Sequence, residues 1–140
     1  MKTQVLKIVL LSLSMLLSMG VQADVLVVTS AGSPLSRLNT DQIQQVFTGK
    51  LHEIEGQTLV PLDLPEDSSA RADFYQQVTG RDTRQMRAYW TQMIFTGRGA
   101  PPRTMTQGDL VNKLKSDASF VGYLPSSADT SGLKVLAHLH

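Results

Sequence analysis

The sequence predicts an α/β fold in a single domain, and three observations indicate it. Residues 24–30 (DVLVVTS) are rich in β-branched residues and contain an apolar run at 25–28, as expected for a strand buried on both faces. Farther along, apolar segments of strand length alternate with stretches in which apolar residues recur every three or four positions, the period of an α-helix. Residues 24–140 are 117 in number, the size of one compact domain.

The first 23 residues have the pattern of a secretory signal peptide. Lys2 and Lys7 provide a positive start, residues 8–17 are apolar apart from small serines, and VQA at 21–23 suits a signal peptidase. The apolar run is shorter than the roughly 20 residues that cross a bilayer. We therefore expect cleavage after residue 23, a mature domain of residues 24–140 in a periplasm or outside the cell, and no permanent membrane anchor.

The composition excludes several classes of protein. Without Lys2 and Lys7, the 13 basic side chains become 11 against 12 acidic ones, so nothing indicates a surface for nucleic acid. The chain has no cysteine, which excludes disulfides, thiolate chemistry and lipidation at cysteine. It also lacks a P-loop, a dinucleotide-binding fingerprint and a G-x-S-x-G sequence. We therefore expect no cofactor.

After the first strand, the pattern predicts a short helix and then a second strand. Asn39 and Thr40 are good N-caps for this helix, and Gly49 is placed to end it. Its apolar face consists of Ile43, Val46 and Phe47. Residues 51–55 are weakly extended, a turn follows at 55–57, and residues 58–64 form the second strand.

The segment 60–75 (VPLDLPEDSSARADFY) joins the second strand to a helix that reaches about Val78. Pro65 ends the strand, and Ser68 and Ser69 are among the candidate N-caps. The free N–H groups and the positive end of a helix make a site for an anion, to which Arg71 would add a guanidinium. The alternative is an ordinary capped turn between a strand and a helix.

The second half of the domain is predicted to hold two helices and two strands. The longer helix begins at Asp82 or Thr83 and ends before a Gly/Pro crossover at 96–103. Its inner face is expected to comprise Met86, Tyr89, Trp90, Met93 and Ile94. Thr106 begins the next helix, residues 119–124 form a strand, and residues 133–139 form an edge strand.

No catalytic or metal site is evident among the titratable residues. His138 and His140 share a strand face, but neither they nor His52 have a zinc-binding sequence pattern around them, so we expect no metal site. The acidic residues of the 60–75 segment could form a carboxylate pair, but nothing in their spacing indicates separated pKa values. Because no set of nucleophile, base and orienting group can be named, we expect a protein that is not an enzyme.

Four segments, in this order, resemble the phosphate-binding (PstS-like) family of type II periplasmic binding proteins, the solute receptors of ABC transporters. They are LNTDQIQQVFTGKL (38–51), LVPLDLPEDSSARADFY (59–75), AYWTQMIFTGRGAPP (88–102) and SFVGYLP (119–125). The resemblance implies an α/β fold with a mixed central β-sheet flanked by helices. Full-length members close two such lobes over the ligand, and this chain resembles a short, single-lobe member.

The resemblance also implies an anion-binding site at Asp67, Ser68, Ser69, Ala70 and Arg71. Residues 68–71 occupy the position of the family's Ser-Gly-Thr loop, with its glycine and threonine replaced by Ala70 and Arg71. Asp67 matches the acidic residue that accepts a proton from bound phosphate.

The family's arginine just before this loop is missing. Leu64 and Pro65 stand near its position, and Arg71 could supply the charge from one turn into the helix. Arg98 and Arg103, in the Gly/Pro crossover, are further candidate ligands for the anion, unless they belong to a surface crossover whose charges face water.

By resemblance, the protein is expected to bind phosphate or a similar oxyanion, with an ABC transporter or another envelope protein as partner. A single open lobe leaves its anion in water, where charge-assisted hydrogen bonds are weak, so binding is expected to be weak unless a second copy or another protein closes the site. The alternative is an interaction or sensory module of the cell envelope that kept the fold and lost tight anion binding. Residues 98–103 would then contact a protein.

Overall fold

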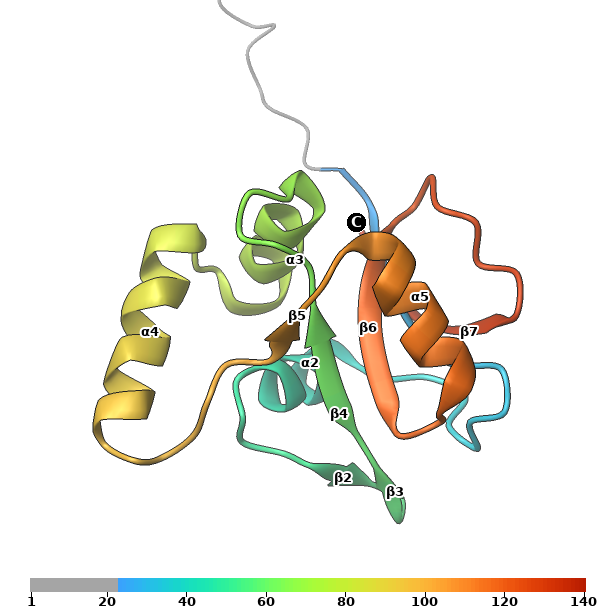
Figure 1. Ribbon diagram of the computed structural model, residues 1–140, viewed down its shortest axis with the longest axis horizontal. Coiled ribbons are helices and arrows are strands. Elements are labelled where there is room, and N and C mark those ends of the chain that lie inside the picture. The colour runs from blue at the N-terminus through green and yellow to red at the C-terminus, as the bar shows by residue number, and fades with distance from the viewer. Residues whose placement is uncertain (1–22) are drawn as a thin grey trace, which may run out of the picture.

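The structure is a computed structural model that describes residues 23–140. The predicted signal peptide lies outside the described residues, apart from residue 23. Figure 1 shows the described elements, which are β1 (Val25–Ser30), α2 (Thr40–Phe47), β2 (Glu53–Ile54), β3 (Gln57–Thr58), β4 (Val60–Asp63), α3 (Ser69–Thr79), α4 (Thr83–Phe95), β5 (Arg103–Thr104), α5 (Gln107–Ser116), β6 (Phe120–Pro125) and β7 (Leu133–Leu139). None of the described helices combines the length and the apolar character needed to cross a bilayer.

A mixed five-stranded sheet forms the centre of the molecule, which confirms the predicted α/β class. Its strand order is β5-β4-β6-β1-β7. β4 runs parallel to both β5 and β6, whereas β1 is antiparallel to both β6 and β7. β7 lies at one edge, as predicted.

The predicted strand at 58–64 is divided into two parts. β3 pairs with β2 in a separate two-stranded sheet, and β4 joins the central sheet. Between them, the N–H of Leu59 donates to the carbonyl of His52 at 2.8 Å instead of to the central sheet.

Helices cover both faces of the sheet. A Cβ added to Gly122 of β6 would meet Leu110 of α5, which therefore packs closely on this face, in front of β6 in Figure 1. Tyr123 is the next residue along β6 and so points to the opposite face. There its ring contacts Phe47 at the end of α2 and Phe74 of α3.

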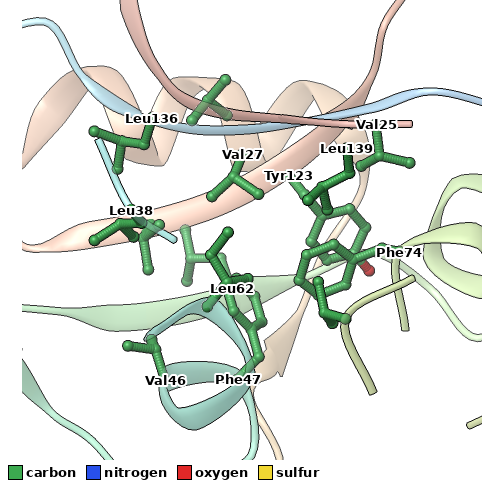
Figure 2. Packing of buried hydrophobic residues seen from close by; sticks show 14 of the residues in the cluster. Val25, Val27, Leu38, Val46, Phe47, Leu62, Phe74, Tyr123, Leu136 and Leu139 are labelled. Carbon is green, nitrogen blue, oxygen red and sulfur yellow. The ribbon is translucent and has the colours of Figure 1, made fainter. Parts of the chain in front are cut away.

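An aromatic cluster occupies the core between the sheet and these two helices (Figure 2). The rings of Phe74 and Tyr123 are stacked, with centroids 4.0 Å apart and planes within 5°. Phe47 meets Phe74 edge-on at 4.7 Å, and Tyr75 meets Phe74 edge-on at 5.1 Å. All four side chains are almost fully buried. Aromatic pairs of this geometry contribute about 0.5–1.5 kcal/mol each beyond the burial of their area, so the cluster fixes α3 against β6.

The helices begin where the capping residues predict. Asn39 and Asp82 form capping boxes at the starts of α2 and α4. Ser68 and Thr106 cap α3 and α5 through their hydroxyl oxygens. Each such cap satisfies an N–H group that the helix leaves without an acceptor, and typically contributes about 1 kcal/mol.

The prediction that Ile94 belongs to the core is wrong. Met86 and Trp90 of α4 are buried, but Ile94 is 57% exposed and the adjacent Phe95 is 90% exposed. The main helical contact of α4 is with α3, and this contact covers only part of the apolar stripe of α4. In Figure 1, α4 lies to one side of the sheet, and its last turn projects away from the core.

Candidate anion-binding site

A cavity of about 400 Å³ lies where β4 and β5 end. Parallel strands end at the same edge of a sheet, and in open α/β sheets this edge is where ligands bind. The register places Asp63 of β4 beside Thr104 of β5, and both line the cavity. The other lining residues come from the 60–75 segment, α4 and the crossover, and are Glu66, Arg71, Thr83, Arg87, Trp90, Thr91, Ile94, Pro101 and Pro102.

The turn between β4 and α3 holds the start of the helix in place. The N–H of Ser68 donates to the carbonyl of Pro65 at 2.9 Å, and the Ser68 hydroxyl accepts from the N–H of Arg71 at 3.2 Å. The N–H groups of Ser69 and Ala70 lie in the first turn, where no acceptor exists within the helix. Neither donates to another described residue. They carry the positive end of the helix dipole.

A buried carboxylate organises the elements around this turn. Asp63 is only 1% exposed. It accepts hydrogen bonds from the hydroxyl of Tyr75 at 2.7 Å, from the N–H of Leu64 at 3.0 Å and from Nε of Arg71 at 3.4 Å. The hydroxyl of Tyr123 donates a further, short hydrogen bond to the same carboxylate. Burial raises the pKa of Asp63, whereas the hydrogen bonds from these tyrosines and the charge of Arg71 act in the opposite direction.

The two tyrosines act as donors over the whole physiological pH range. Burial is the main cause that raises the pKa of Tyr75 and of Tyr123, and the negative charge of Asp63 adds to it. Both hydroxyls therefore stay protonated and keep donating to Asp63. The Tyr123 hydroxyl also accepts from the N–H of Leu64 at 3.2 Å, so β4, β6 and α3 meet at one hydrogen-bonded point.

Arg71 is buried, and of its guanidinium nitrogens only Nε makes a hydrogen bond within the described residues. Its Nε donates to Asp63, and its Cζ lies 5.0 Å from the centre of the Tyr75 ring. The two terminal nitrogens make no hydrogen bond with any residue in the described part of the chain. Arg71 lines the cavity, so an oriented guanidinium with unused donors is available to an anion there.

The far wall of the cavity contains a second arginine, on α4. Arg87 forms an exposed ion pair with Glu66, and its hydrogen bond lowers the pKa of that carboxyl. One turn farther along α4, the indole N–H of Trp90 is buried and has no hydrogen-bond partner among residues 23–140. The formal charges of the lining cancel, because Asp63 and Glu66 balance the two arginines.

Of the predicted site residues, only Arg71 lines this cavity. Asp67 is exposed on the turn before α3, and Ser69 is exposed at the first residue of that helix. The structure does not bring the crossover arginines to Arg71. Arg98 lines another cavity with Gly49 and Tyr89, and Arg103 lines two neighbouring ones.

Sequence reasoning did not assign Tyr75, Tyr123, Arg87 or Trp90 to the site. One local signal was present, because Arg71 and Tyr75 are four residues apart and therefore share a helix face. The other three lie on β6 (Tyr123) and α4 (Arg87 and Trp90). Local sequence patterns do not reveal how these elements are placed relative to α3.

Neither the protein-family models nor the curated proteins match this chain. Solved structures do match it. One is a protein from Clostridium perfringens, assigned as a phosphate ABC transporter substrate-binding protein, with bound phosphate. It matches with a TM-score of 0.63 and 15% sequence identity, and the match covers 81% of this chain and 45% of that one. An ABC-type phosphate transport receptor from Vibrio cholerae has TM-score 0.63 and 12% identity, covering 84% and 47%. PstS from Borrelia burgdorferi has TM-score 0.59 and 12% identity, covering 84% and 49%.

At these identities the match establishes the fold. The chain spans about half the length of each of these proteins, so its mixed sheet and helices correspond to a single lobe. All three are described as binding proteins, receptors or PstS, and none as an enzyme. The resemblance seen in the sequence is thus matched in three dimensions: the chain has the fold of one lobe of a PstS-like phosphate-binding protein.

Proposed function

We propose that the protein is a periplasmic solute-binding protein for phosphate or a similar oxyanion. The main support for the proposal is Arg71, a buried arginine that lines the cavity at the start of α3. Its Nε donates to Asp63, and its terminal nitrogens have no hydrogen-bond partner among the described residues. The lobe shared with phosphate receptors supports it, and the predicted signal peptide supports the location.

The chemistry of the cavity suits a tetrahedral oxyanion. A guanidinium donates two parallel hydrogen bonds to phosphate, and a fixed guanidinium loses less entropy on binding than a mobile one. Thr83, Thr91 and Thr104 line the same space. The hydroxyls of Thr83 and Thr104 provide further donors, whereas that of Thr91 already donates to the carbonyl of Arg87 at 2.9 Å. The start of α3 adds a partial positive charge beside Arg71.

Two features of the lobe limit the affinity. The charges that line the cavity cancel, so an incoming anion must compete with Glu66 for Arg87. A single lobe also leaves one side of the ligand in water, which weakens each charge-assisted bond. We therefore expect a Kd in the millimolar range, about 4 kcal/mol of binding free energy. A second copy or another envelope protein that covered the cavity would strengthen binding.

Calorimetric titration of inorganic phosphate into the purified protein tests the proposal. Phosphate is expected to bind, and Arg71→Ala to weaken binding at least tenfold. Arg37→Ala provides the matched control, because Arg37 is an exposed arginine outside the cavity.

Arg87→Ala is a second test, since the exposed Arg87 can be removed without disturbing the core. Circular dichroism of each variant shows whether it is folded. The proposal is wrong if millimolar phosphate produces no heat, or if neither cavity variant differs from Arg37→Ala.

The second candidate function is that of an interaction module of the cell envelope. Its motivating observation is the exposed apolar pair Ile94 and Phe95 at the end of α4. A photo-crosslinking residue placed at position 95 in cells should then attach a partner, which one placed at the exposed position 37 should not. Crosslinking that is equal at both positions would refute this function.

A further inference from the structure

We propose that Asp24, His138 and His140 form a binding site for a divalent transition metal such as Zn²⁺. The three side chains present a carboxylate oxygen and two imidazole nitrogens that all lie within 4.8 Å of one another. The site is separate from the cavity at Arg71 and does not depend on the proposed anion binding. It lies where β1 begins and β7 ends, at the edge of the sheet.

The strand register brings the three residues together. β1 and β7 are antiparallel, with Val25 paired with Leu139. One position farther, Asp24 and His140 face each other, and the two-residue period of a strand puts His138 on the same side. We expected no metal site because no zinc-binding sequence pattern surrounds the two histidines. Asp24 is 114 residues away from His138 in the sequence, so only the fold brings it beside them.

The distances match those between the ligands of one metal ion. Oδ2 of Asp24 lies 3.2 Å from Nε2 of His138 and 3.7 Å from Nδ1 of His140. Ligands bonded to tetrahedral zinc at about 2.0–2.1 Å are separated by about 3.4 Å. The two imidazole rings lie side by side, with centroids 4.3 Å apart and planes inclined at 30°.

The donor set determines which metals the site would accept. Two imidazoles and one carboxylate suit Zn²⁺, Cu²⁺ and Ni²⁺, whereas Mg²⁺ and Ca²⁺ prefer oxygen ligands alone. Three protein ligands leave a fourth position for water or another ligand. The side chains are 44–74% exposed, so an ion can enter from solvent without movement of the backbone.

Titration of the untagged, EDTA-treated and dialysed protein tests the site. ZnCl₂ is expected to bind to one saturable site per chain, and MgCl₂ to give no binding. Asp24→Asn, His138→Asn and His140→Asn are each expected to weaken zinc binding at least tenfold. His52→Asn is the matched control, because His52 is exposed and lies on another loop.

The chain has only three histidines, so their ring signals in an NMR spectrum can be assigned by these same variants. Zn²⁺ should shift the signals of His138 and His140 and leave that of His52 in place. It should also raise the melting temperature of the wild-type protein but not that of His138→Asn, since a ligand that binds only the folded state stabilises it. The absence of saturable zinc binding, or its retention in the double variant His138→Asn/His140→Asn, would overturn the proposal.

Discussion

The hydroxyl of Tyr75 donates a 2.7 Å hydrogen bond to Oδ2 of Asp63, and this bond joins the second turn of α3 to the end of β4. The same carboxylate binds Tyr123 of β6 and Nε of Arg71. The candidate ligand for the anion is therefore held by groups that themselves belong to the core. The free energy of unfolding and the affinity for an anion should therefore both depend on this network. Substitutions at its different residues can distinguish the two effects.

Replacing Tyr75 by Phe should lower the free energy of unfolding by about 2 kcal/mol. It removes a donor to a charged acceptor, for which mutational losses are about 1.5–3 kcal/mol. Tyr89→Phe is the matched control, because its hydroxyl donates at the same distance, 2.7 Å, to the neutral carbonyl of Thr48. That change should cost about 1 kcal/mol. Urea denaturation measures both, and equal losses would contradict a charged acceptor at Tyr75.

The protein should lose stability in alkaline solution because of Tyr75 and Tyr123. Burial raises both pKa values in the folded state, whereas in the unfolded chain tyrosines ionise near pH 10. Above about pH 10 the folded state therefore holds more protons than the unfolded state, and its stability falls as pH rises. Each tyrosine contributes a slope of about 1.4 kcal/mol per pH unit there.

Denaturation between pH 9 and pH 11 checks this slope. In Tyr75→Phe the free energy of unfolding should fall less steeply with pH, by the slope of about 1.4 kcal/mol per pH unit that one tyrosine contributes. If the variant and the wild type decline in parallel, Tyr75 does not stay protonated in the folded protein.

Gly122→Ala should destabilise the protein by about 1–3 kcal/mol, the usual cost of overpacking a core. Its added Cβ would lie 3.0 Å from Cδ2 of Leu110, so the buried Leu110 side chain would have to shift by a few tenths of an ångström within a packed core. Gly108→Ala is the control, because nothing lies within 4 Å of its added Cβ and the position is within α5. Alanine there should stabilise the helix by roughly 0.5–1 kcal/mol. Opposite shifts in the urea midpoint are thus expected.

Changes along α4 should show how little of its apolar stripe is buried. Met86→Ala should cost about 2–5 kcal/mol, because Met86 is fully buried and its removal leaves a cavity. Ile94→Ser, at the exposed end of the same stripe, should change stability by less than about 0.5 kcal/mol. A large loss from Ile94→Ser would show that this end of α4 is covered in solution, for example by a partner copy. Thermal unfolding at two protein concentrations would then distinguish the cause.

Local signals account for most of what the sequence predicted correctly. The helix starts at Asn39, Ser68, Asp82 and Thr106 depend on hydrogen bonds between residues three apart, so they are visible in the sequence. Periodicity shows that a helix has an apolar face, but not how much of that face a neighbour covers. This is why the core position of Ile94 was predicted wrongly.

The candidate sites depended more on contacts between distant segments. The position of Arg71 at the start of a helix followed from the Pro65 and serine pattern. Its partner Asp63 is eight residues away and lies on a strand, and Tyr123 is 60 residues from Asp63. Such pairs depend on the order of strands in the sheet, which the spacing of apolar residues does not determine.

The edges of the sheet restrict how another protein could attach. β5 is only two residues long and follows Pro101 and Pro102, so it offers almost no backbone for a further strand. On β7, the ladder with β1 is irregular at Val27 and Val28, and the carbonyl of Leu136 already accepts from the N–H of Leu38 at 3.0 Å. Irregular and occupied edges of this kind oppose strand addition and amyloid-like stacking. Recognition by side chains on the helices and loops is therefore the form of association that this architecture favours.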